Sequence, residues 1–474
     1  MGRSRSFRQR EASWGQPVID DSAKEKMIRL LGAGNFSDAR EDRTCYAYDA
    51  TRRRCLPDAV VFPETVECIS GLLKVANEFG IPVVPRGAGS GFTGGSIPVE
   101  GGIVIVMNHF NRILEIDTDN LQVTVESGIV TWDLHQAVES VGLFYPPDPA
   151  SMKHCTIGGN IAENAGGMRA VKYGVTKDYV MGLEVVLPTG EILRTGSRCV
   201  KDVVGYNLTQ LFVGSEGTLG IVTKAILKLL PLPDTQKTLT AAFPTMDAAA
   251  KTVSGIIRSR IIPTTIEFMD RHSIGAVEQH LRLGLPLHAE ALLLIEVDGE
   301  KNQVENSIVR VKEACAANGA IEIKIASDKA ERDLLWRARR AITVSLLRLR
   351  PRKVNEDIVV PRSKIPDIID RIDRIGKKHG LIIVNFGHAG DGNIHVNVLF
   401  RNDPEEEKRA EMAVDDIFRE TISLGGLISG EHGIGITKRK YMSWCLEEPV
   451  LALMRSMKKM LDPNNILNPG KIFP

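Results

Sequence analysis

The sequence predicts an α+β protein in two parts, because two different alternations of strands and helices follow one another along the chain. From Asp58 onward, the short apolar strands "AVVFP" and "IPVVP" flank an amphipathic helix, "TVECISGLLKVANEFG". Beyond Thr238 a strand–helix–strand pattern occurs twice, which is typical of a ferredoxin-like sheet. The chain length of 474 residues accommodates roughly two to four domains.

The first part begins with a helical pattern up to Arg53, in which residues 24–31 carry apolar side chains at helix spacing. The stretches "GGIVIVM" and "LQVTVESG" predict two strands, and "TWDLHQAVESVG" predicts a helix with a Thr N-cap and a Gly stop. In the second part we expect strands over 238–243, 264–269, 291–297 and 321–326, with helices over 246–259 and 303–317.

The glycine loop "VVPRGAGSGFTGGSIP" contains the spacing G-x-G-x-x-G at Gly89, Gly91 and Gly94, which is typical of Rossmann dinucleotide sites. Such a site requires a helix that begins at the glycines and an acidic residue about 20 positions later. Here the glycines run into Pro98 and then into a strand, so the context excludes a Rossmann nicotinamide site. Consecutive glycines also let backbone N–H groups surround an anionic diphosphate, although on this loop alone an ordinary glycine-rich turn is an equal alternative.

Two further glycine-rich stretches follow in the same β-rich region. The second, "TIGGNIAENAGG", holds two glycine pairs among small polar residues. The third, "GSEGTLGIVTKAILKLLP", leads from a glycine loop into a long apolar strand. Three glycine-rich loops within one β-rich region indicate a large ligand that lies along the sheet.

Charge and hydropathy exclude two classes of protein. The formal net charge is +1, so there is no overall basic field for nucleic acid. No apolar stretch approaches the roughly 18–20 residues that cross a bilayer. Because no apolar core follows Arg3, Arg5, Arg8 and Arg10, we interpret this N-terminus as a solvated, poorly ordered leader and not as a secretory signal. We expect a cytoplasmic protein, at most peripheral to the inner membrane through a partner.

The seven cysteines are scattered, and no two of them form a C-x-x-C pair. The sequence therefore encodes neither a zinc knuckle nor an iron–sulfur cluster, and it fits a reducing compartment. Any electrons that are passed onward must leave through another molecule.

The strongest chemical signal is "LIIVNFGHAGDGNIHVNVLF", in which two apolar alternating runs flank Asp391 and Gly392, a preferred type I′ hairpin turn. A loop of these two residues places His388 directly opposite His395, so that both imidazoles can bind one ion. Asn397 emerges on the same face. Two ligands do not complete a metal site, and a hairpin with two buried, hydrogen-bonded histidines is an equal alternative.

Two other stretches offer polar groups. The loop "SGEHGIG" presents a carboxylate and an imidazole, Glu431 and His432, although a simple polar loop would look the same. The helical stretch "LLWRARRAITVSLLRLRPRK" carries several arginines, which on their own indicate a solvated helix face.

Over nearly the whole chain and in the right order, the motifs "PRGAGSGFTGG", "TIGGNIAENAGG", "VGSEGTLGIVT", "NFGHAGDGNIHVN", "SGEHGIG" and "LDPNNILNPGKIF" resemble those of the FAD-linked oxidases of the vanillyl-alcohol oxidase/PCMH type. The resemblance is to the branch of glycolate oxidase catalytic subunits, D-lactate dehydrogenases and D-2-hydroxyglutarate dehydrogenases. It implies a PCMH-type FAD-binding domain of two α+β subdomains over residues 53–233, preceded by a leader and helical segment over 1–52. A ferredoxin-like substrate-cap domain would occupy 234–474, its last part returning to the FAD domain.

The resemblance also implies which residues hold FAD. The loop over 86–95 would bind the diphosphate, the second stretch would line the flavin and its ribityl chain, and residues from Glu216 onward would close over the adenosine side or the ring. Relatives with covalent flavin carry a His or Cys at fixed loop positions, and the first loop has neither. We therefore expect dissociable FAD and interpret His154 and Cys155 as loop packing. The implied set is Pro85, Arg86, Gly87, Ala88, Gly89, Ser90, Gly91, Thr93, Gly94, Gly95, Pro147, Asp148, Thr156, Gly158, Gly159, Asn160, Asn164, Gly166, Gly167, Glu216, Gly220, Ile221, Val222 and Asn468.

For the chemistry, the resemblance implies that His388, His395 and Glu431 bind a divalent ion, Zn²⁺ or Mn²⁺, and that His432 takes the proton of the substrate hydroxyl. Such a site suits the oxidation of a 2-hydroxy acid, in which the Cα hydrogen leaves as hydride toward the flavin. An ion on the hydroxyl lowers its pKa, and a neutral imidazole accepts the proton near neutral pH.

The resemblance implies that Arg339 binds the substrate carboxylate, and its guanidinium fork suits bidentate pairing. We expect Arg337 and Arg340 to lie on the solvated face of the same helix. Thr343, one helical turn beyond Arg339, would assist. Asn397 completes the expected catalytic set.

One position departs from the D-2-hydroxyglutarate branch, which has a lysine that helps to hold the distal carboxylate. In "VNEDIVVP" that position is Asn355, and Lys353 lies two residues earlier on the same strand face. The departure favours D-lactate or glycolate, with D-2-hydroxyglutarate as the alternative. We expect an FAD-dependent 2-hydroxy-acid dehydrogenase or oxidase that acts on CH–OH donors.

Two rival functions remain. One is a transferase similar to alkylglycerone-phosphate synthase, which shares this architecture and carries related histidines. The other is a non-catalytic flavin electron-relay subunit, against which the complete cap domain argues. With no cysteine cluster and no nicotinamide site, we expect electrons to pass to a separate redox partner: an iron–sulfur subunit, an electron-transfer flavoprotein, a cytochrome or a quinone pathway.

Overall fold

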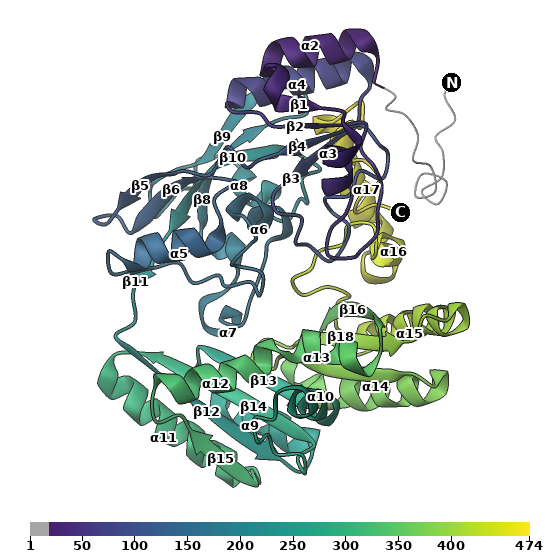
Figure 1. The fold of residues 1–474 in the computed structure, drawn as a ribbon. Coiled ribbons are helices and arrows are strands. Elements are labelled where there is room, and N and C mark those ends of the chain that lie inside the picture. Colours follow the sequence, from purple (N-terminus) through teal and green to yellow (C-terminus); the bar gives the residue numbers. More distant parts are fainter. Residues whose placement is uncertain (1–18) are drawn as a thin grey trace. The chain divides into compact units, whose positions relative to one another are not determined.

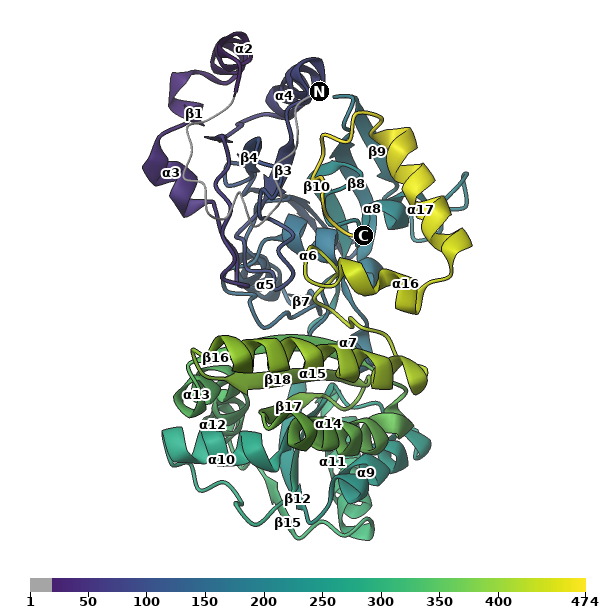
Figure 2. The same cartoon turned by 90° about the vertical axis from the view of Figure 1, so that its right-hand side faces the viewer.

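The computed structural model describes residues 19–474, so the leader with Arg3, Arg5, Arg8 and Arg10 lies outside the described residues. The chain divides into two compact units. Unit 1 contains the residues up to Gly167 together with Val175–Leu232 and Glu431–Pro474, and unit 2 contains Met168–Gly174 and Pro233–Gly430. Figures 1 and 2 show their helices and strands. Within residues 19–474, every helix is too short or too polar to traverse a lipid bilayer.

The first sheet of unit 1 has four strands in the order β1-β2-β4-β3, with β2, β4 and β3 parallel. Helix α4 connects β2 to β3, and its Ile69, Leu72 and Leu73 are buried in the core that the sheet shares with α2. The helix begins after Thr65, whose hydroxyl accepts a hydrogen bond from Cys68 N. The elements are α2 (Asp21–Leu31), β1 (Phe36–Ser37), α3 (Arg40–Cys45), β2 (Ala59–Val61), α4 (Val66–Phe79), β3 (Val83–Arg86) and β4 (Ile103–Val106).

The second sheet of unit 1 is antiparallel, in the order β5-β6-β10-β8-β9. In β10 every second residue is buried, as expected of a strand with one face on a core. The elements are β5 (Ile113–Asp117), β6 (Gln122–Glu126), α5 (Thr131–Glu139), β7 (Leu143–Phe144), α6 (Ile157–Glu163), β8 (Val180–Val186), β9 (Ile192–Gly196), α8 (Leu208–Phe212), β10 (Ile221–Lys228), β11 (Leu230–Pro231), α16 (Met442–Cys445) and α17 (Glu448–Leu461).

Two local predictions for this unit are wrong. The N-cap of α5 is Val130, not Thr131, because the buried Thr131 hydroxyl donates to Cys155 O at 3.2 Å. The second glycine stretch is not a loop throughout, because it forms helix α6 after its N-cap Thr156. In contrast, no helix begins between β3 and β4, so the first glycine stretch has the helix-free context that excludes a Rossmann site.

Unit 2 is built on a seven-stranded antiparallel sheet in the order β15-β12-β14-β13-β17-β18-β16. The strands β12, β13, β14 and β15 have the spatial order of a ferredoxin-like fold, which confirms the predicted sheet. Strands β17, β18 and β16 extend it. The elements are α7 (Ala170–Tyr173), β12 (Thr235–Phe243), α9 (Met246–Arg258), β13 (Thr265–Asp270), α10 (Arg271–Leu281), β14 (Ala291–Gly299), α11 (Lys301–Ala317), β15 (Glu322–Ile325), α12 (Lys329–Arg340), α13 (Ile342–Leu349), β16 (Arg352–Val359), α14 (Ile365–His379), β17 (Ile382–His388), β18 (Asn393–Phe400) and α15 (Pro404–Ser423).

Helices of unit 2 pack on this sheet, and one of its faces carries both an apolar core and polar side chains. Helices α9, α11, α14 and α15 form a row in which neighbours contact one another. Helices α10, α12 and α13 pack on the face that carries Met269 and Phe386, where Ile342 joins the apolar core. Because side chains alternate along a strand, Glu267 and His388 point to this same face.

The hairpin of β17 and β18 has a different register from the predicted one. Its loop contains residues 389–392, so His388 lies opposite Asn393 and His395 lies opposite Phe386. The predicted pairing of His388 with His395 is wrong because the turn is wider, with His388 O accepting a hydrogen bond from Gly392 N at 3.0 Å. The shift of two residues nevertheless leaves both histidines on one face of the sheet.

Gly392 closes this turn with a φ of 93°, and a Cβ there would lie 2.0 Å from Val360 O. We expect Gly392→Ala to lower the midpoint of thermal unfolding, because the clash adds to a backbone strain of about 1–3 kcal/mol. Gly425→Ala is the matched control, since Gly425 has a φ of 77° and nothing within 4 Å of an added Cβ. It should shift the midpoint less. Equal shifts in calorimetry would contradict the described turn.

Candidate active site

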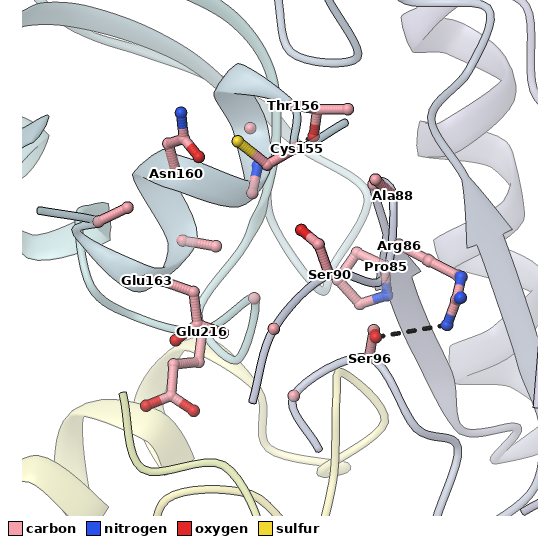
Figure 3. A pocket seen from close by; sticks show the side chains of 18 of the residues that line it. Pro85, Arg86, Ala88, Ser90, Ser96, Cys155, Thr156, Asn160, Glu163 and Glu216 are labelled. Atoms are coloured by element: carbon pink, nitrogen blue, oxygen red, sulfur yellow. Dashed lines mark hydrogen bonds between the residues drawn. The ribbon is translucent and has the colours of Figure 1, made fainter. Parts of the chain in front are cut away.

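A pocket in unit 1 is lined by all three glycine-rich stretches. Its empty space amounts to about 1370 Å³, part of it open to solvent. Figure 3 shows Ser90, Thr156 and Glu216, one from each stretch, around this space. The predicted cofactor residues that line it are Pro85, Arg86, Gly87, Ala88, Gly89, Ser90, Gly91, Gly95, Thr156, Gly158, Gly159, Asn160, Gly166, Glu216, Gly220, Ile221, Val222 and Asn468.

The first glycine stretch presents a row of backbone N–H donors. None of the described residues accepts a hydrogen bond from the backbone N–H groups of residues 88–92. Glycine lets the loop fold closely, since a Cβ on Gly87 would lie 2.3 Å from Thr156 Oγ1 and one on Gly89 would lie 2.2 Å from Arg86 Nη2. A row of N–H donors without protein acceptors fits an anionic diphosphate.

Six predicted cofactor residues do not line the pocket. Two of them hold the C-terminal segment: Thr93 O accepts a hydrogen bond from Ile436 N at 2.8 Å, and a Cβ on Gly94 would lie 2.4 Å from the side chain of Ile436. Asn164 ends α6 in the left-handed conformation. The six are Thr93, Gly94, Pro147, Asp148, Asn164 and Gly167.

The C-terminal segment ties the glycine stretches together. Asn468 Nδ2 donates to Gly95 O at 3.0 Å and to Glu216 O at 2.7 Å, and so joins the first and third stretches. Lys471 Nζ donates to Asn468 Oδ1 at 2.9 Å and to Ile97 O at 2.7 Å. Burial lowers the pKa of Lys471 to about 7.

Glu216 holds the loop that carries His432. Its carboxylate accepts hydrogen bonds from Ile434 N at 2.7 Å and from Gly435 N at 2.6 Å. Burial raises the pKa of Glu216, while these two N–H donors oppose the rise. The resemblance implied only a contact with the cofactor, so this supporting role was missed.

Glu431 and His432 both line the pocket of unit 1. The His432 ring stacks on Phe92, with ring centroids 5.0 Å apart and planes at 28°. Phe92 was not among the predicted residues, although an aromatic residue inside a glycine loop is a signal that could have indicated it. His432 therefore lies between the first glycine stretch and the segment that Glu216 orders.

Cys155 lines the pocket, whereas His154 is exposed and does not. Burial raises the pKa of the Cys155 thiol, and the Thr131 hydroxyl lies 3.4 Å from its sulfur. A thiol with a raised pKa is a weak nucleophile. The other lining residues that were not predicted are Ser96, Met107, Ser127, Pro149, Ala150, Ser151, Ala162, Glu163, Ala165, Phe212, Ser215 and Gly217.

In unit 2, His388 and His395 meet on one face of the sheet, the face that also carries Phe386. Their Nε2 atoms are 3.4 Å apart, and their rings lie at 83° with centroids 5.2 Å apart. Both side chains are buried. Two imidazole nitrogens that converge in this way can bind a single divalent ion.

Glu267 joins His388 to Arg339 and was not predicted. It is fully buried, and its Oε1 accepts a hydrogen bond from His388 Nδ1 at 2.5 Å. Its Oε2 accepts from Arg339 Nε at 2.7 Å and Nη2 at 2.6 Å. Burial alone would raise the pKa of Glu267, but His388 and Arg339 outweigh it and hold that pKa below its ordinary value.

Arg339 differs from its neighbours on α12. It is buried over the Phe386 ring at 4.6 Å, whereas Arg337 and Arg340 are exposed as expected. Glu267 occupies the side of its guanidinium that carries Nε and Nη2. Thr343 is exposed on α13, because α12 ends at Arg340 and the predicted continuous helix is interrupted there.

Asn397 lies on the same face, opposite Asn355 of β16. Lys353 Nζ donates to Asn397 Oδ1 at 2.8 Å, so the lysine reaches the position expected from its place on the strand. Asn355 Oδ1 is buried and has no hydrogen-bond partner within residues 19–474. These polar groups continue the face beyond the two histidines.

The chain leaves unit 2 beside His395. Gly430, the last residue of unit 2, donates its N–H to Asp357 Oδ2 at 2.7 Å, and Asp357 is paired with His395 in the sheet. Glu431 follows Gly430 by one peptide unit, so its Cα lies about 3.8 Å further along the chain.

Two family models match the chain. Residues 57–196 match an FAD binding domain, and residues 232–472 match the C-terminal domain of FAD linked oxidases. The chain is 48% identical to the glycolate oxidase subunit GlcD of Bacillus subtilis (strain 168), over 96% of this chain and 97% of that protein. It is 37% identical to a D-lactate dehydrogenase of Anaerostipes hadrus, over 88% of this chain and 89% of that protein.

A solved structure shares the fold. p-Cresol methylhydroxylase with bound substrate superposes with a TM-score of 0.81 at 20% identity, over 96% of this chain and 98% of that one. The likeness confirms the predicted class, a PCMH-type FAD-binding domain with a C-terminal FAD-oxidase domain. The chain belongs to the family of FAD-linked oxidases.

Proposed function

We propose that this chain is an FAD-dependent dehydrogenase that oxidises a small 2-hydroxy acid, D-lactate or glycolate, to the 2-oxo acid. The observation that carries the proposal is the cluster in unit 2 in which Glu267 joins a buried arginine to two facing histidines. An arginine suits a carboxylate, and paired histidines suit an ion on the adjacent hydroxyl. The relatives named glycolate oxidase subunit and D-lactate dehydrogenase support this substrate class.

Arg339 would bind the substrate carboxylate through the Nη1 side of its guanidinium. Glu267 holds the opposite side, and the Phe386 ring supports the plane of the group. A fixed guanidinium orients the acid, so that its hydroxyl and its Cα hydrogen face defined groups.

His388 and His395 would bind a divalent ion, Zn²⁺ or Mn²⁺, with Glu431 as third ligand. The residues fit such an ion because His388 Nδ1 is engaged by Glu267, which leaves the Nε2 lone pair directed toward His395. Glu431 follows the residue anchored beside His395. When bound, the ion lowers the pKa of a coordinated hydroxyl.

His432 would accept the hydroxyl proton. FAD, when bound, would supply the acceptor for the Cα hydrogen, which leaves as hydride and gives the 2-oxo acid. An imidazole is the side chain suited to take a proton near neutral pH. Phe92 and the backbone hydrogen bonds of Glu216 hold the His432 segment in place. Asn397 and Thr343 would assist on the substrate side.

We propose that FAD binds without a covalent bond. The backbone N–H groups of residues 88–92 supply donors for the diphosphate, and the same loop contains no His or Cys. The buried Cys155 thiol, with its raised pKa, fits a packing role.

Lys353, Asn355 and Asn397, which lie beyond the histidines on the same face, help to decide between a short acid and a longer dicarboxylic acid. Lys353 is hydrogen-bonded to Asn397, and Asn355 stands where the D-2-hydroxyglutarate branch has a lysine. We therefore favour D-lactate and glycolate, and we keep D-2-hydroxyglutarate as the second candidate because Lys353 still brings a cation to this face.

The reduced flavin would pass its electrons to a separate protein, an iron–sulfur subunit or an electron-transfer flavoprotein. All seven cysteines lie within the described residues, and no two of them form a C-x-x-C motif. The name of the Bacillus subtilis relative, a subunit, supports a partner of this kind.

Anaerobic mixing of the FAD-loaded chain with D-lactate or glycolate should bleach the absorbance of oxidised flavin. His432→Gln should slow the bleaching about 10²–10⁴-fold, because the hydroxyl proton loses its acceptor. A chelator should also slow it. A panel of D- and L-acids that includes D-2-hydroxyglutarate would identify the substrate.

The same assay separates the rival functions. A transferase similar to alkylglycerone-phosphate synthase would form an alkylglycerone phosphate without net flavin bleaching, and a relay subunit would not reduce an artificial dye with any 2-hydroxy acid. Absence of bleaching by every acid would overturn the proposed function, and rapid reduction of NAD⁺ would overturn the proposed partner.

Arg339→Lys should raise the KM for the acid about 10–100-fold, because a hydrogen bond to a charged group contributes roughly 1.5–3 kcal/mol. Arg337→Lys, on the exposed face of the same helix, is the matched control and should leave the KM unchanged. Steady-state kinetics with a dye acceptor measure both. An unchanged KM in Arg339→Lys would remove the arginine from the substrate site.

Gly89→Ala should weaken FAD binding at least about tenfold, because a φ of 67° and the guanidinium of Arg86 leave no room for the methyl group. Gly142→Ala is the control, since Gly142 also has a positive φ, 77°, but open space and no place in the pocket. Flavin fluorescence during titration of the apoprotein measures both affinities. Equal losses would contradict the proposed diphosphate site.

A further inference from the structure

We infer that Glu267 is a positioning residue, which orients His388 for the ion and Arg339 for the substrate carboxylate at the same time. The inference rests on the proposed function and adds a residue to it. Glu267 acts through its two partners, one on each carboxylate oxygen. It lies on β13, directly opposite His388 of β17 in the sheet.

The hydrogen bond to His388 selects one form of that imidazole. Because His388 Nδ1 donates its proton to Glu267 Oε1, the Nε2 atom keeps its lone pair on the side of His395, 3.4 Å away. A carboxylate behind a metal-binding histidine fixes the ring and increases its basicity. Without Glu267, the imidazole would lose the hydrogen bond that fixes its orientation, and the two Nε2 atoms would no longer converge.

The ion pair with Arg339 fixes the direction of the arginine. Arg339 Nε and Nη2 both donate to Glu267 Oε2, in a contact from which solvent is nearly excluded. A buried guanidinium needs a charged partner, so Glu267 also keeps the arginine on this face of the sheet. One side chain thus connects the expected ion site to the expected carboxylate site.

The test is Glu267→Gln, which keeps the shape and removes the charge. For the metal-free protein, competition with a chelating dye should show an affinity for Zn²⁺ and Mn²⁺ that is about 10–100-fold weaker than in the wild type. In protein saturated with metal and FAD, the KM for the acid should rise by at least about tenfold, because Arg339 loses its fixed orientation. FAD binding should not change.

Glu296→Gln is the matched control. Glu296 is a buried carboxylate on the neighbouring strand β14, and its Oε2 accepts hydrogen bonds from Thr238 and from Trp336 of α12. It therefore bonds to the same helix as Glu267 through Trp336 and not through Arg339. Its substitution should lower thermal stability and leave the metal affinity and the KM unchanged.

The outcomes distinguish this inference from the proposed function. A wild-type chain that binds neither ion would refute the ion site of the proposed function, and the inference would fail with it. If the wild type binds the ion and Glu267→Gln binds it equally well, or if Glu296→Gln weakens it as much, only the inference fails. Should Glu267→Gln not fold, Glu267→Asp is measured instead. Its shorter side chain keeps the charge but cannot reach both partners, so wild-type affinity and KM in this variant would also refute the inference.

Discussion

Side chains alternate between the two faces of a β-sheet, and this alternation decides whether the polar residues of unit 2 can meet. Glu267 and His388 are paired between β13 and β17, and Asp357 and His395 are paired between β16 and β18. All four side chains point to one face of the sheet, because residues that are paired across neighbouring strands share a face and every second residue along a strand does so too. A slip of a single residue between β17 and β18 would turn His395 toward the opposite face. The seven-stranded sheet, with apolar helices packed on it, prevents that slip.

In unit 1 the corresponding constraint is the return of the chain's last segment. The glycine stretches supply backbone N–H groups around the pocket. Asn468, from the C-terminal segment, connects the first and third stretches through two hydrogen bonds. Glu216 extends this frame to Ile434 and Gly435, just after His432. The groups around the cofactor pocket and the expected base are therefore parts of one hydrogen-bonded frame, although they lie far apart in the sequence.

The sequence predicted what local rules determine, and it failed where packing overrides them. The alternation of apolar and polar residues along the hairpin correctly predicted that His388 and His395 share a face. It did not predict that the loop has four residues. Helix α6 was missed because glycines at its start are poor helix formers, and Gly158 is there since a Cβ would lie 2.8 Å from Ser127. The role of Glu267 could not be predicted because Glu267 is 121 residues from His388 in the sequence, and no local pattern predicts that β13 lies beside β17.

The charges of the proposed site explain why a buried carboxylate belongs between an arginine and a histidine. Glu267 offsets the charge of Arg339. In the proposed site, the two charges of a bound ion would offset the carboxylates of Glu431 and the substrate. The bound state would then be neutral, and loss of the hydroxyl proton would leave a single negative charge that departs with the hydride. Without Glu267 the site would carry an extra positive charge, which would stabilise the alkoxide and so oppose transfer of its electrons. In the proposed site, a carboxylate at this position would orient Arg339 for the acid and would also favour release of the hydride.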